Sequence, residues 1–224
     1  SDGYGGTDTL DNFEGVVGSA YDDTLIAGDN PNDFQDLEGG AGNDTLVGSA
    51  GEDRAIFDDA PMGVRVDLSS ANADGEVTVS DGYGGTDTLI DIDHVRGSDG
   101  GSDVLIGDGD YNQLDGRAGN DVLIGGGDDD RLEGGAGGDS FVYTSNTDST
   151  LSTGIDRIED FTTGEDKVVF DGMDGVSYIG RTVDLVNGSW TSTEAAIEAD
   201  ATIQDEVVFF TDTSGDGHLY VKGS

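Results

Sequence analysis

A nine-residue repeat is the feature that most constrains how this chain folds. Five frames run without interruption from Ser98 to Val142, each close to the pattern G-G-x-G-x-D-x-U-x, in which U is a large apolar residue. A clear example within this run is GRAGNDVLI at Gly116 to Ile124. A further frame, GGAGNDTLV, lies outside the run at Gly39 to Val47. The ten residues SDGYGGTDTL also occur twice, at Ser1 to Leu10 and Ser80 to Leu89, which indicates a tandem duplication. This regularity argues against the disorder that 39 glycines would otherwise favour.

The repeat predicts a short strand and a tight turn in every frame. Six glycine-rich residues suit a turn that needs positive φ, and the three residues x-U-x suit a strand with its central side chain pointing inward. Two frames then make one coil, and stacked coils pair their strands in parallel. The resulting core is thin, because one large apolar residue in nine cannot offset about 1 to 2 kcal/mol of backbone entropy per residue. Another stabilising contribution is needed.

The charge of the chain indicates what that contribution is. The sequence has 49 Asp and Glu residues against nine Lys and Arg, a formal net charge of -40, so we expect bound cations. The same charge argues against nucleic acid and anionic lipid as partners. No apolar run is long enough for a membrane span, the chain has no cysteine, and Ser1 to Leu10 lacks the features of a cleavable signal.

Aspartates at the sixth position of frames that lie two repeats apart should face each other across adjacent coils. An apposed pair of carboxylates without a basic partner suits a hard divalent cation, and all-oxygen ligation favours Ca²⁺ over Mg²⁺ or zinc. The predicted pairs are Asp103 with Asp121, Asn112 with Asp130, and Asp121 with Asp139, and Asp148 lies two repeat lengths beyond Asp130. Asp23 and Asp44 have the same spacing once a short insertion around Ala27 to Asp29 is removed. The alternative is that these aspartates only form turns.

We therefore expect an all-β fold, a right-handed parallel β-roll or β-helix with several Ca²⁺ ions, four or more, bound in the turns. Residues 1–56 would form a first repeat block, residues 57–97 inserted wider β-rungs, residues 98–142 a second repeat block, and residues 143–224 a C-terminal β-rich cap. Within the insert, strands are expected around residues 64–68, 77–79 and 89–95. Within the cap, we expect one helix at residues 191–200 and strands at residues 206–211 and 218–222.

The repeats resemble the C-terminal region of RTX proteins, secreted by type I systems, especially serralysin-type metalloproteases and alginate epimerases. The stretch Gly134 to Phe170, GGAGGDSFVYTSNTDSTLSTGIDRIEDFTTGEDKVVF, is similar to the segment that caps the roll in those proteins. The resemblance is strong over residues 98–170, good over residues 18–56 and loose elsewhere. It implies a module that passes the exporter unfolded and folds on extracellular Ca²⁺, with calcium ions and the type I secretion machinery as partners.

The resemblance also implies the ligands of each ion. Carbonyl groups at the second and fourth positions and the Asp of one repeat would act with carbonyl groups at the first and third positions and the Asp two repeats later. The implied sets are Asp99, Gly101 and Asp103 with Gly116, Ala118 and Asp121; Asp108, Asp110 and Asn112 with Gly125, Gly127 and Asp130; Arg117, Gly119 and Asp121 with Gly134, Ala136 and Asp139; and Gly126, Asp128 and Asp130 with Asp148 and Asp156. In the first block the set is Ser19, Tyr21 and Asp23 with Gly39, Ala41 and Asp44.

We do not expect the chain to be an enzyme. The protease zinc motif H-E-x-x-H is absent, since the histidines are His94 and His218, and neither has a nucleophile signature around it. The alternatives are a Ca²⁺-dependent adhesin or module that binds extracellular polysaccharide, or part of a protease or polysaccharide-modifying enzyme whose catalytic domain is missing. The end at Leu219 to Ser224 lacks an export tail, so we expect a longer parent protein.

Some features have two interpretations. Asp67, Asp74, Asp81 and Asp87 in the insert are expected to be solvated turn acids rather than further Ca²⁺ ligands. The loop Asp212 to Gly217 resembles the start of an EF-hand, but a hairpin turn is favoured because Gly223 stands where a bidentate Glu belongs. Trp190 and Tyr178 are expected in packing rather than in a sugar-stacking patch.

Overall fold

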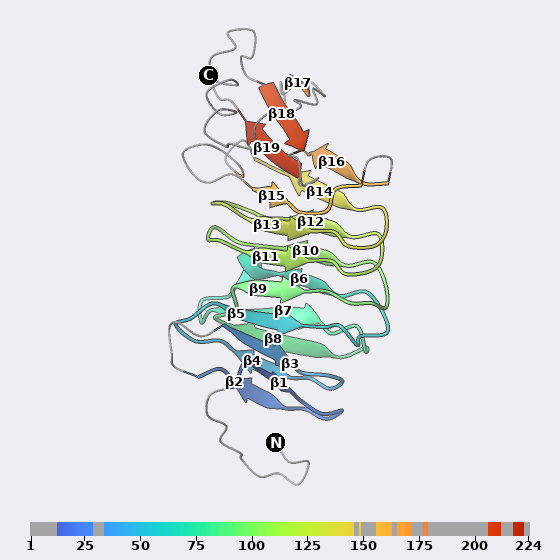
Figure 1. The fold of residues 1–224 in the computed structure, drawn as a ribbon. Helices are drawn as coiled ribbons and strands as arrows, with labels where there is room; N and C mark the ends of the chain where they lie inside the picture. The colour runs from blue at the N-terminus through green and yellow to red at the C-terminus, as the bar shows by residue number, and fades with distance from the viewer. Residues whose placement is uncertain are drawn as a thin grey trace.

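A computed structural model describes residues 13–28, 34–145, 148, 156–162, 165–171, 177–178, 206–211 and 217–221. These residues form short β-strands and one 3₁₀ helix, η1 (Leu68–Ser70). Strands and turns alternate along the chain and stack as successive coils from the N-terminal to the C-terminal end (Figure 1). The predicted all-β parallel roll is thus confirmed. Among the described residues, no helix is long and apolar enough to cross a membrane.

The strands form two sheets. The first sheet has the order β1 (Gly15–Val17), β3 (Gln35–Glu38), β5 (Asp53–Ile56), β9 (His94–Arg96), β11 (Gln113–Asp115), β13 (Arg131–Glu133), β15 (Arg157–Ile158), β19 (Gly217–Val221), β18 (Glu206–Thr211) and β17 (Ser177–Tyr178). The second sheet has the order β16 (Lys167–Phe170), β14 (Ser140–Tyr143), β12 (Val122–Ile124), β10 (Val104–Ile106), β6 (Arg65–Asp67), β7 (Glu76–Ser80), β8 (Thr86–Ile90), β4 (Thr45–Val47) and β2 (Thr24–Ile26).

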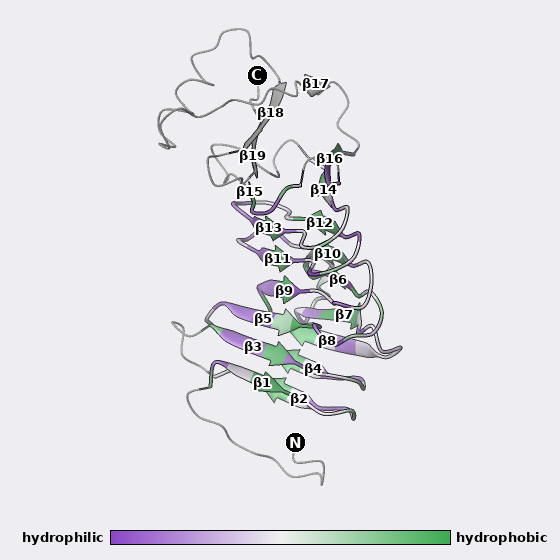
Figure 2. Ribbon diagram, turned by 45° about the vertical axis from the view of Figure 1, so that its right-hand side comes forward, coloured by the Kyte–Doolittle hydropathy of each residue, from purple (hydrophilic) through white to green (hydrophobic). Residues whose placement is uncertain are grey.

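The core is a column of side chains between the two sheets. The eighth-position residues of the second block are almost completely buried; they are Leu105, Leu114, Leu123, Leu132 and Phe141. Their flanking residues in the strands are more exposed, which is the alternation expected of x-U-x. Figure 2 shows apolar residues within the strands, flanked by polar residues in the strands and in much of the turns. One buried side chain in each of the strands β10 to β13 keeps the core narrow.

The second block has the predicted register. Leu105 lies opposite Leu123, and Leu114 lies opposite Leu132, so neighbouring strands of a sheet are two repeats apart in the sequence. In the first block Leu25 lies opposite Leu46, a slightly longer separation that agrees with the predicted insertion between β2 and β3. The local repeat therefore sets the register wherever the frames are consecutive.

The insert differs from the expected wider rungs. The three expected strand segments are present, but the last is divided between β8 and β9, and β7 runs antiparallel to both β6 and β8. All three strands β6, β7 and β8 join the second sheet, whereas in the first sheet β5 pairs directly with β9. A hairpin closes its backbone hydrogen bonds locally, which lets the chain enlarge one sheet without adding to the other.

The C-terminal region adds further strands to the first sheet. Strand β19 pairs antiparallel with both β15 and β18, and His218 lies opposite Arg157 in that register. The expected helix at residues 191–200, Trp190 and most of the Asp212 to Gly217 loop lie outside the described residues. The strands expected at 206–211 and 218–222 correspond to β18 and β19.

Candidate metal centre

The sixth-position residues form two ladders along the turns of the roll. In each rung, one carboxylate oxygen accepts a hydrogen bond from the backbone amide of the sixth-position residue in the preceding rung. The amide of Asp103 donates to Oδ1 of Asp121 over 2.7 Å, and the amide of Asp121 donates to Oδ1 of Asp139 over 2.8 Å. On the opposite side, the amide of Asn112 donates to Oδ1 of Asp130 over 2.8 Å. The three predicted pairs are therefore neighbours.

The ladders continue where the spacing is irregular. The amide of Asp23 donates to Asp44 over 2.8 Å, and the amide of Asp44 donates to Asp87 over 2.8 Å although 43 residues separate the two. Beyond the second block, the amide of Asp139 donates to Asp166 over 2.8 Å. Sequence reasoning missed Asp87 and Asp166 as ladder residues. For Asp87 a signal existed, because GYGGTDTLI at residues 82–90 follows the frame with only its second and third residues exchanged.

The rung after Asp130 is formed by Asp156 and not by Asp148. The amide of Asp130 donates to Oδ1 of Asp156 over 3.1 Å, and Arg131 lies opposite Arg157 in the strand register. Asp148 instead accepts hydrogen bonds from the amides of Thr144 and Ser145, 2.7 and 2.8 Å away, within its own turn. Counting two repeats from Asp130 places Asp148 in the ladder, but the strand that pairs with β13 is β15, which begins directly after Asp156.

The second oxygen of each ladder carboxylate divides the rungs into two kinds. In the first kind it is bound within its own turn: Oδ2 of Asp23, Asp103 and Asp166 accepts the amide of Ser19, Ser98 and Thr162, respectively, each over 2.6 Å. In the second kind Oδ2 is buried and has no hydrogen-bond partner among the described residues. We call these the open carboxylates; they are Asp44, Asp87, Asp121, Asp130 and Asp139.

The open carboxylates are unfavourable as anions in the absence of a cation. Burial, opposed by hydrogen bonds from backbone amides, raises the pKa of Asp87, Asp121 and Asp130 to about 7 in each case. Neighbouring carboxylates raise the pKa further: Asp103 and Asp139 act on Asp121, and Asp44 acts on Asp87. For Asp156, burial and then the charge of Asp130 raise the pKa to about 9. A bound cation would remove this cost.

The donor set fits a hard cation such as Ca²⁺. A Cβ atom added to Gly116 would meet Oδ2 of Asp121 at 2.6 Å and the carbonyl oxygen of Gly134, in the next rung, at 2.8 Å. Carboxylate and carbonyl oxygens thus converge where glycine leaves space. No group of three His, Cys, Asp or Glu side chains in the described part of the chain is arranged to hold a metal. Any ion would therefore need backbone carbonyls as well as carboxylates, which is the type of ligation that Ca²⁺ accepts.

The structure places the predicted carbonyl ligands in the turns but gives some of them other partners. The carbonyls of Asp108 and Arg117 accept hydrogen bonds from the amides of Gly127 and Ala136 in the next rung, both over 2.8 Å. The carbonyl of Ala136 accepts the amide of Gly119 over 2.9 Å. A carbonyl oxygen has two lone pairs, so these bonds leave one for a cation. The complete ligand sets remain predictions.

The prediction of solvated turn acids in the insert is wrong for two of the four residues. Asp81 and Asp87 are 0% and 1% exposed, whereas Asp74 is exposed. Burial follows from the hairpin, because β8 pairs with β4 of the first block and brings the turn before it against the neighbouring rung. Sequence alone could not show which strand β8 would join.

His94 has a structural environment. Its side chain is 0% exposed, stacks on Phe34 with 5.4 Å between ring centroids, and accepts the amide of Gln113 at Nδ1 over 3.1 Å. Its Nε2 lies 3.4 Å from a carboxylate oxygen of Glu52. Both ring nitrogens therefore have partners within the protein.

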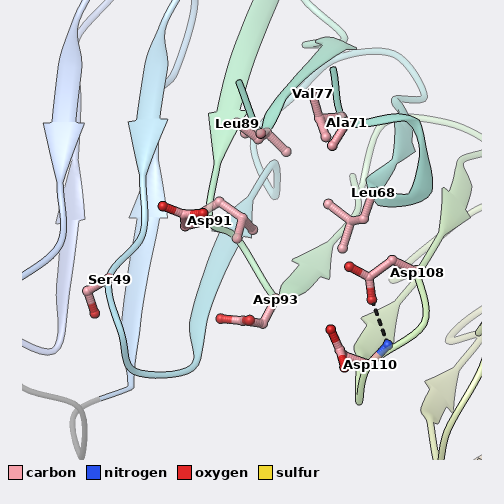
Figure 3. Close-up of a pocket in the computed structure, with 11 residues that line it drawn as sticks. Ser49, Leu68, Ala71, Val77, Leu89, Asp91, Asp93, Asp108 and Asp110 are labelled. Atoms are coloured by element: carbon pink, nitrogen blue, oxygen red, sulfur yellow. Dashed lines mark hydrogen bonds between the residues drawn. The ribbon is translucent and has the colours of Figure 1, made fainter. Parts of the chain in front are cut away.

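A cavity of about 340 Å³ opens where the insert meets the second block. Leu68, Val77 and Leu89 form an apolar side, and carboxylates including Asp91 and Asp108 form the other (Figure 3). In the turn of the second block, the amide of Asp110 donates to Oδ1 of Asp108 over 3.0 Å. The cavity thus borders two of the predicted ligands, Asp108 and Asp110.

The chain was compared with protein-family models, curated proteins and solved structures. Residues 11–221 match a family model described as peptidase M10 serralysin C terminal. No curated protein matched the chain. Among solved structures, a similarity was found to the extracellular lipase LipA from Serratia marcescens, with 21% identity over 73% of this chain and 33% of the lipase and a TM-score of 0.21. The chain therefore spans about a third of the length of that lipase.

Proposed function

Because this chain belongs to the peptidase M10 serralysin C-terminal family, we propose that it is a Ca²⁺-binding RTX module that folds when it meets extracellular Ca²⁺. The observation that supports the proposal most directly is the set of open carboxylates. Their Oδ2 atoms are buried, lack hydrogen-bond partners among the described residues, and lie in turns whose glycines leave space beside them.

Carboxylates and glycines of the turns would have different roles in binding Ca²⁺. Oδ1 of Asp121 and of Asp139 is fixed by an amide of the neighbouring rung, which orients Oδ2 towards the turn. The positive φ of Gly126, Gly135 and Gly137 lets the turns of successive rungs approach closely. A bound Ca²⁺ would supply the positive charge that offsets the repulsion between carboxylates in adjacent rungs.

The size of this effect would make folding depend on Ca²⁺. With a Kd of about 10⁻⁴ M, as for extracellular modules, millimolar Ca²⁺ contributes about 1.4 kcal/mol per site. Four or five sites would contribute roughly 6 to 7 kcal/mol, comparable to the stability of a whole domain. Cytosolic Ca²⁺ is far lower, so the chain would stay unfolded inside the cell and fold outside. We propose on this basis that it supports type I secretion and extracellular stability of its parent protein.

Circular dichroism during a Ca²⁺ titration tests the folding proposal. The chelated protein should give the spectrum of an unfolded chain and develop a β spectrum with rising Ca²⁺, and Mg²⁺ at the same concentration should have little effect. The triple variant Asp121→Asn, Asp130→Asn, Asp139→Asn should need a higher Ca²⁺ concentration. A native spectrum in excess EDTA would contradict the proposal.

We further propose that the chain has no catalytic activity of its own. The proposal is supported by the regular placement of its buried carboxylates, which the two ladders already use for backbone hydrogen bonds. Incubating the Ca²⁺-loaded protein with alginate, other acidic glycans and casein should give no product. Turnover that copurifies with the folded protein would disprove it.

A further inference from the structure

The cavity beside the insert is a feature that the repeat pattern does not explain. In the second block each turn carries the chain from one sheet to the other, whereas after β6 the chain turns back through η1 into β7 within the same sheet. The first sheet adds no strand at this level, because β5 pairs directly with β9. The cavity of about 340 Å³ is bounded by the connection from β6 to β7 and by the turns after β4, β8 and β10. Its volume is in the range of small-molecule sites.

One wall of the cavity is apolar. It is formed by Leu68, Val77 and Leu89, which belong to the core of the roll and lie together in the close-up view (Figure 3). The cavity is nevertheless open to solvent, since Ala71 and Asp91 line it and are exposed. Water in contact with such a wall is unfavourable, and a hydrocarbon chain that replaced this water would be stabilised there.

The opposite wall carries carboxylates without a basic partner. Oδ2 of Asp93 accepts the amide of Asp53 and Oδ1 of Asp108 accepts the amide of Asp110, each over 3.0 Å. Both acids are partly buried, and their other carboxylate oxygens accept no hydrogen bond from residues that the structure describes. Burial raises the pKa of Asp93. Within the described ranges, no Lys or Arg lines the cavity, and no ion pair involves its four acids, Asp91, Asp93, Asp108 and Asp110.

The two walls together favour a ligand that is cationic at one end and hydrocarbon at the other. A metal ion would be attracted by the carboxylates but would leave the apolar wall in contact with water. An uncharged apolar molecule would cover that wall but would leave the carboxylates without a counter-charge. An ammonium group on an aliphatic chain satisfies both walls, and the net charge of -40 attracts cations towards the protein.

We propose that this cavity binds an organic cation, a protonated primary amine on an aliphatic chain such as a lysine side chain or a free alkylamine. The ammonium group would lie among the carboxylates of Asp93, Asp108 and Asp110, and the chain would lie against Leu68 and Val77. This site is separate from the carboxylate ladders, because its selectivity depends on the apolar wall that the insert supplies.

Calorimetric titration of the wild type in saturating Ca²⁺ tests both walls. The probes are ammonium, n-butylammonium, n-hexylammonium and n-hexanol. Each additional buried methylene should strengthen binding about threefold, so n-hexylammonium should bind about tenfold more tightly than n-butylammonium. Ammonium and n-hexanol should bind much more weakly than n-hexylammonium. Equal affinity for ammonium and n-hexylammonium, or no binding of n-hexylammonium, would overturn the proposal.

Variants locate the bound amine. Ala71→Trp places a large side chain at an exposed position of the lining and should weaken n-hexylammonium binding at least about tenfold. The double variant Asp91→Asn, Asp108→Asn should weaken it about fivefold. Asparagine keeps the acceptor for the amide of Asp110 and tolerates the φ of +50° at residue 91. The matched control Asp22→Asn, Asp59→Asn removes two exposed charges outside the lining and should bind like the wild type.

Undiminished binding by Ala71→Trp that has a native circular dichroism spectrum would show that the amine binds elsewhere and would refute the site. Acetyl-glycyl-lysyl-glycinamide and its Nε-acetylated form distinguish the two sources of the amine. Binding of the lysine peptide, abolished by acetylation, assigns the cavity to a lysine of a partner protein, whereas binding of free alkylamines alone assigns it to a small molecule. A wild type that folds with Ca²⁺ but binds none of these amines refutes this inference and leaves the proposed function intact.

Discussion

The second repeat block and the insert reach the same carboxylate ladder by different routes. In the block, Asp103, Asp121 and Asp139 follow each other at intervals of two repeats, and each contact is given by the repeat length. At the insert, the residue that follows Asp44 in the ladder is Asp87, which is 43 residues later in the sequence. The insert between them contributes three strands, β6, β7 and β8, to one sheet. The contact distance is 2.8 Å in both the Asp44 to Asp87 and the Asp121 to Asp139 rungs.

This comparison shows that the contact between rungs is maintained in space and not along the chain. Where the insert meets the second block, the ladder is interrupted. Oδ1 of Asp103 accepts the amide of Val64 over 2.7 Å, so the residue before it in the ladder is apolar and has no carboxylate. The second block therefore begins at a rung without an opposed carboxylate. Electrostatic repulsion, and any benefit from Ca²⁺, should accordingly be distributed unequally between the two regions.

Removal of Ca²⁺ should produce the largest difference between the regions. We expect chelation to abolish amide exchange protection over residues 98–142, since several sites of about 1.4 kcal/mol each would be lost there. As Ca²⁺ is withdrawn stepwise, protection should be lost last in β7 and β8, which share five cross-strand pairs and bury Val77, Val79 and Leu89. Hydrogen exchange by mass spectrometry measures this, and equal loss in both regions would refute the distinction.

Truncation of the core should affect the two regions alike. Leu123 in the block and Leu89 in the insert are 0% and 1% exposed and belong to the same core. Leu123→Ala and Leu89→Ala should each lower the free energy of unfolding in Ca²⁺ by about 2 to 5 kcal/mol. Denaturant unfolding measures both, with Val122→Ala on the outer side of the same strand as the control. A small effect of Leu89→Ala would mean that the insert folds independently.

Open and serine-bound carboxylates should respond differently to loss of charge. Asp121 is open and takes part in two predicted sites, whereas Oδ2 of Asp103 is bound by Ser98 and the residue has one predicted site. Asp121→Asn should cost roughly 3 kcal/mol of Ca²⁺-dependent stability, about twice the cost of Asp103→Asn. Thermal unfolding is measured at about 1 mM Ca²⁺, a tenfold excess over the expected Kd, and again in EDTA. The difference between the two measurements gives the Ca²⁺-dependent stability of each variant. Equal losses for the two variants would contradict the assignment of two sites to Asp121.

Close approach of the turns can be tested at glycines. Gly135 has φ +90°, and a Cβ there would collide with the carbonyl oxygen of Arg117, so Gly135→Ala should cost about 2 kcal/mol. Gly84 in the insert has φ +103° but open space around it, so Gly84→Ala should cost about 1 kcal/mol from backbone strain alone. Gly109→Ala has neither problem and serves as the control in the same unfolding assay.

Acidic pH should partly replace Ca²⁺ in both regions. The folded-state pKa of Asp87, Asp121 and Asp130 is about 7, above the ordinary value of 3.8, so metal-free stability falls as pH rises through this interval. In EDTA, the β signal in circular dichroism should therefore be larger at pH 5 than at pH 8. Proton competition should also raise the half-saturating Ca²⁺ concentration about fivefold from pH 7 to pH 6 when one such group must ionise, because a group with a pKa of about 7 is already half protonated at pH 7. Opposite trends would contradict the assigned pKa directions.

The sequence by itself determined the strand and turn of every regular frame. The glycine positions, the buried column at Leu105 to Phe141 and the evenly spaced pairs of the second block all follow from a local period. Backbone geometry within a single frame is enough to specify them, because each frame repeats the same turn and presents the same side chain inward.

Only the tertiary structure decided which residues continue the ladders across interruptions. Asp87 lies near the start of β8, and Asp156 and Asp166 directly precede β15 and β16. These strands find their partners through sheet pairing over 26 to 43 residues. The burial of Asp81 has the same origin, since it depends on β8 pairing with β4. A local period cannot encode such choices, because they depend on which free edge of the sheet the returning chain completes.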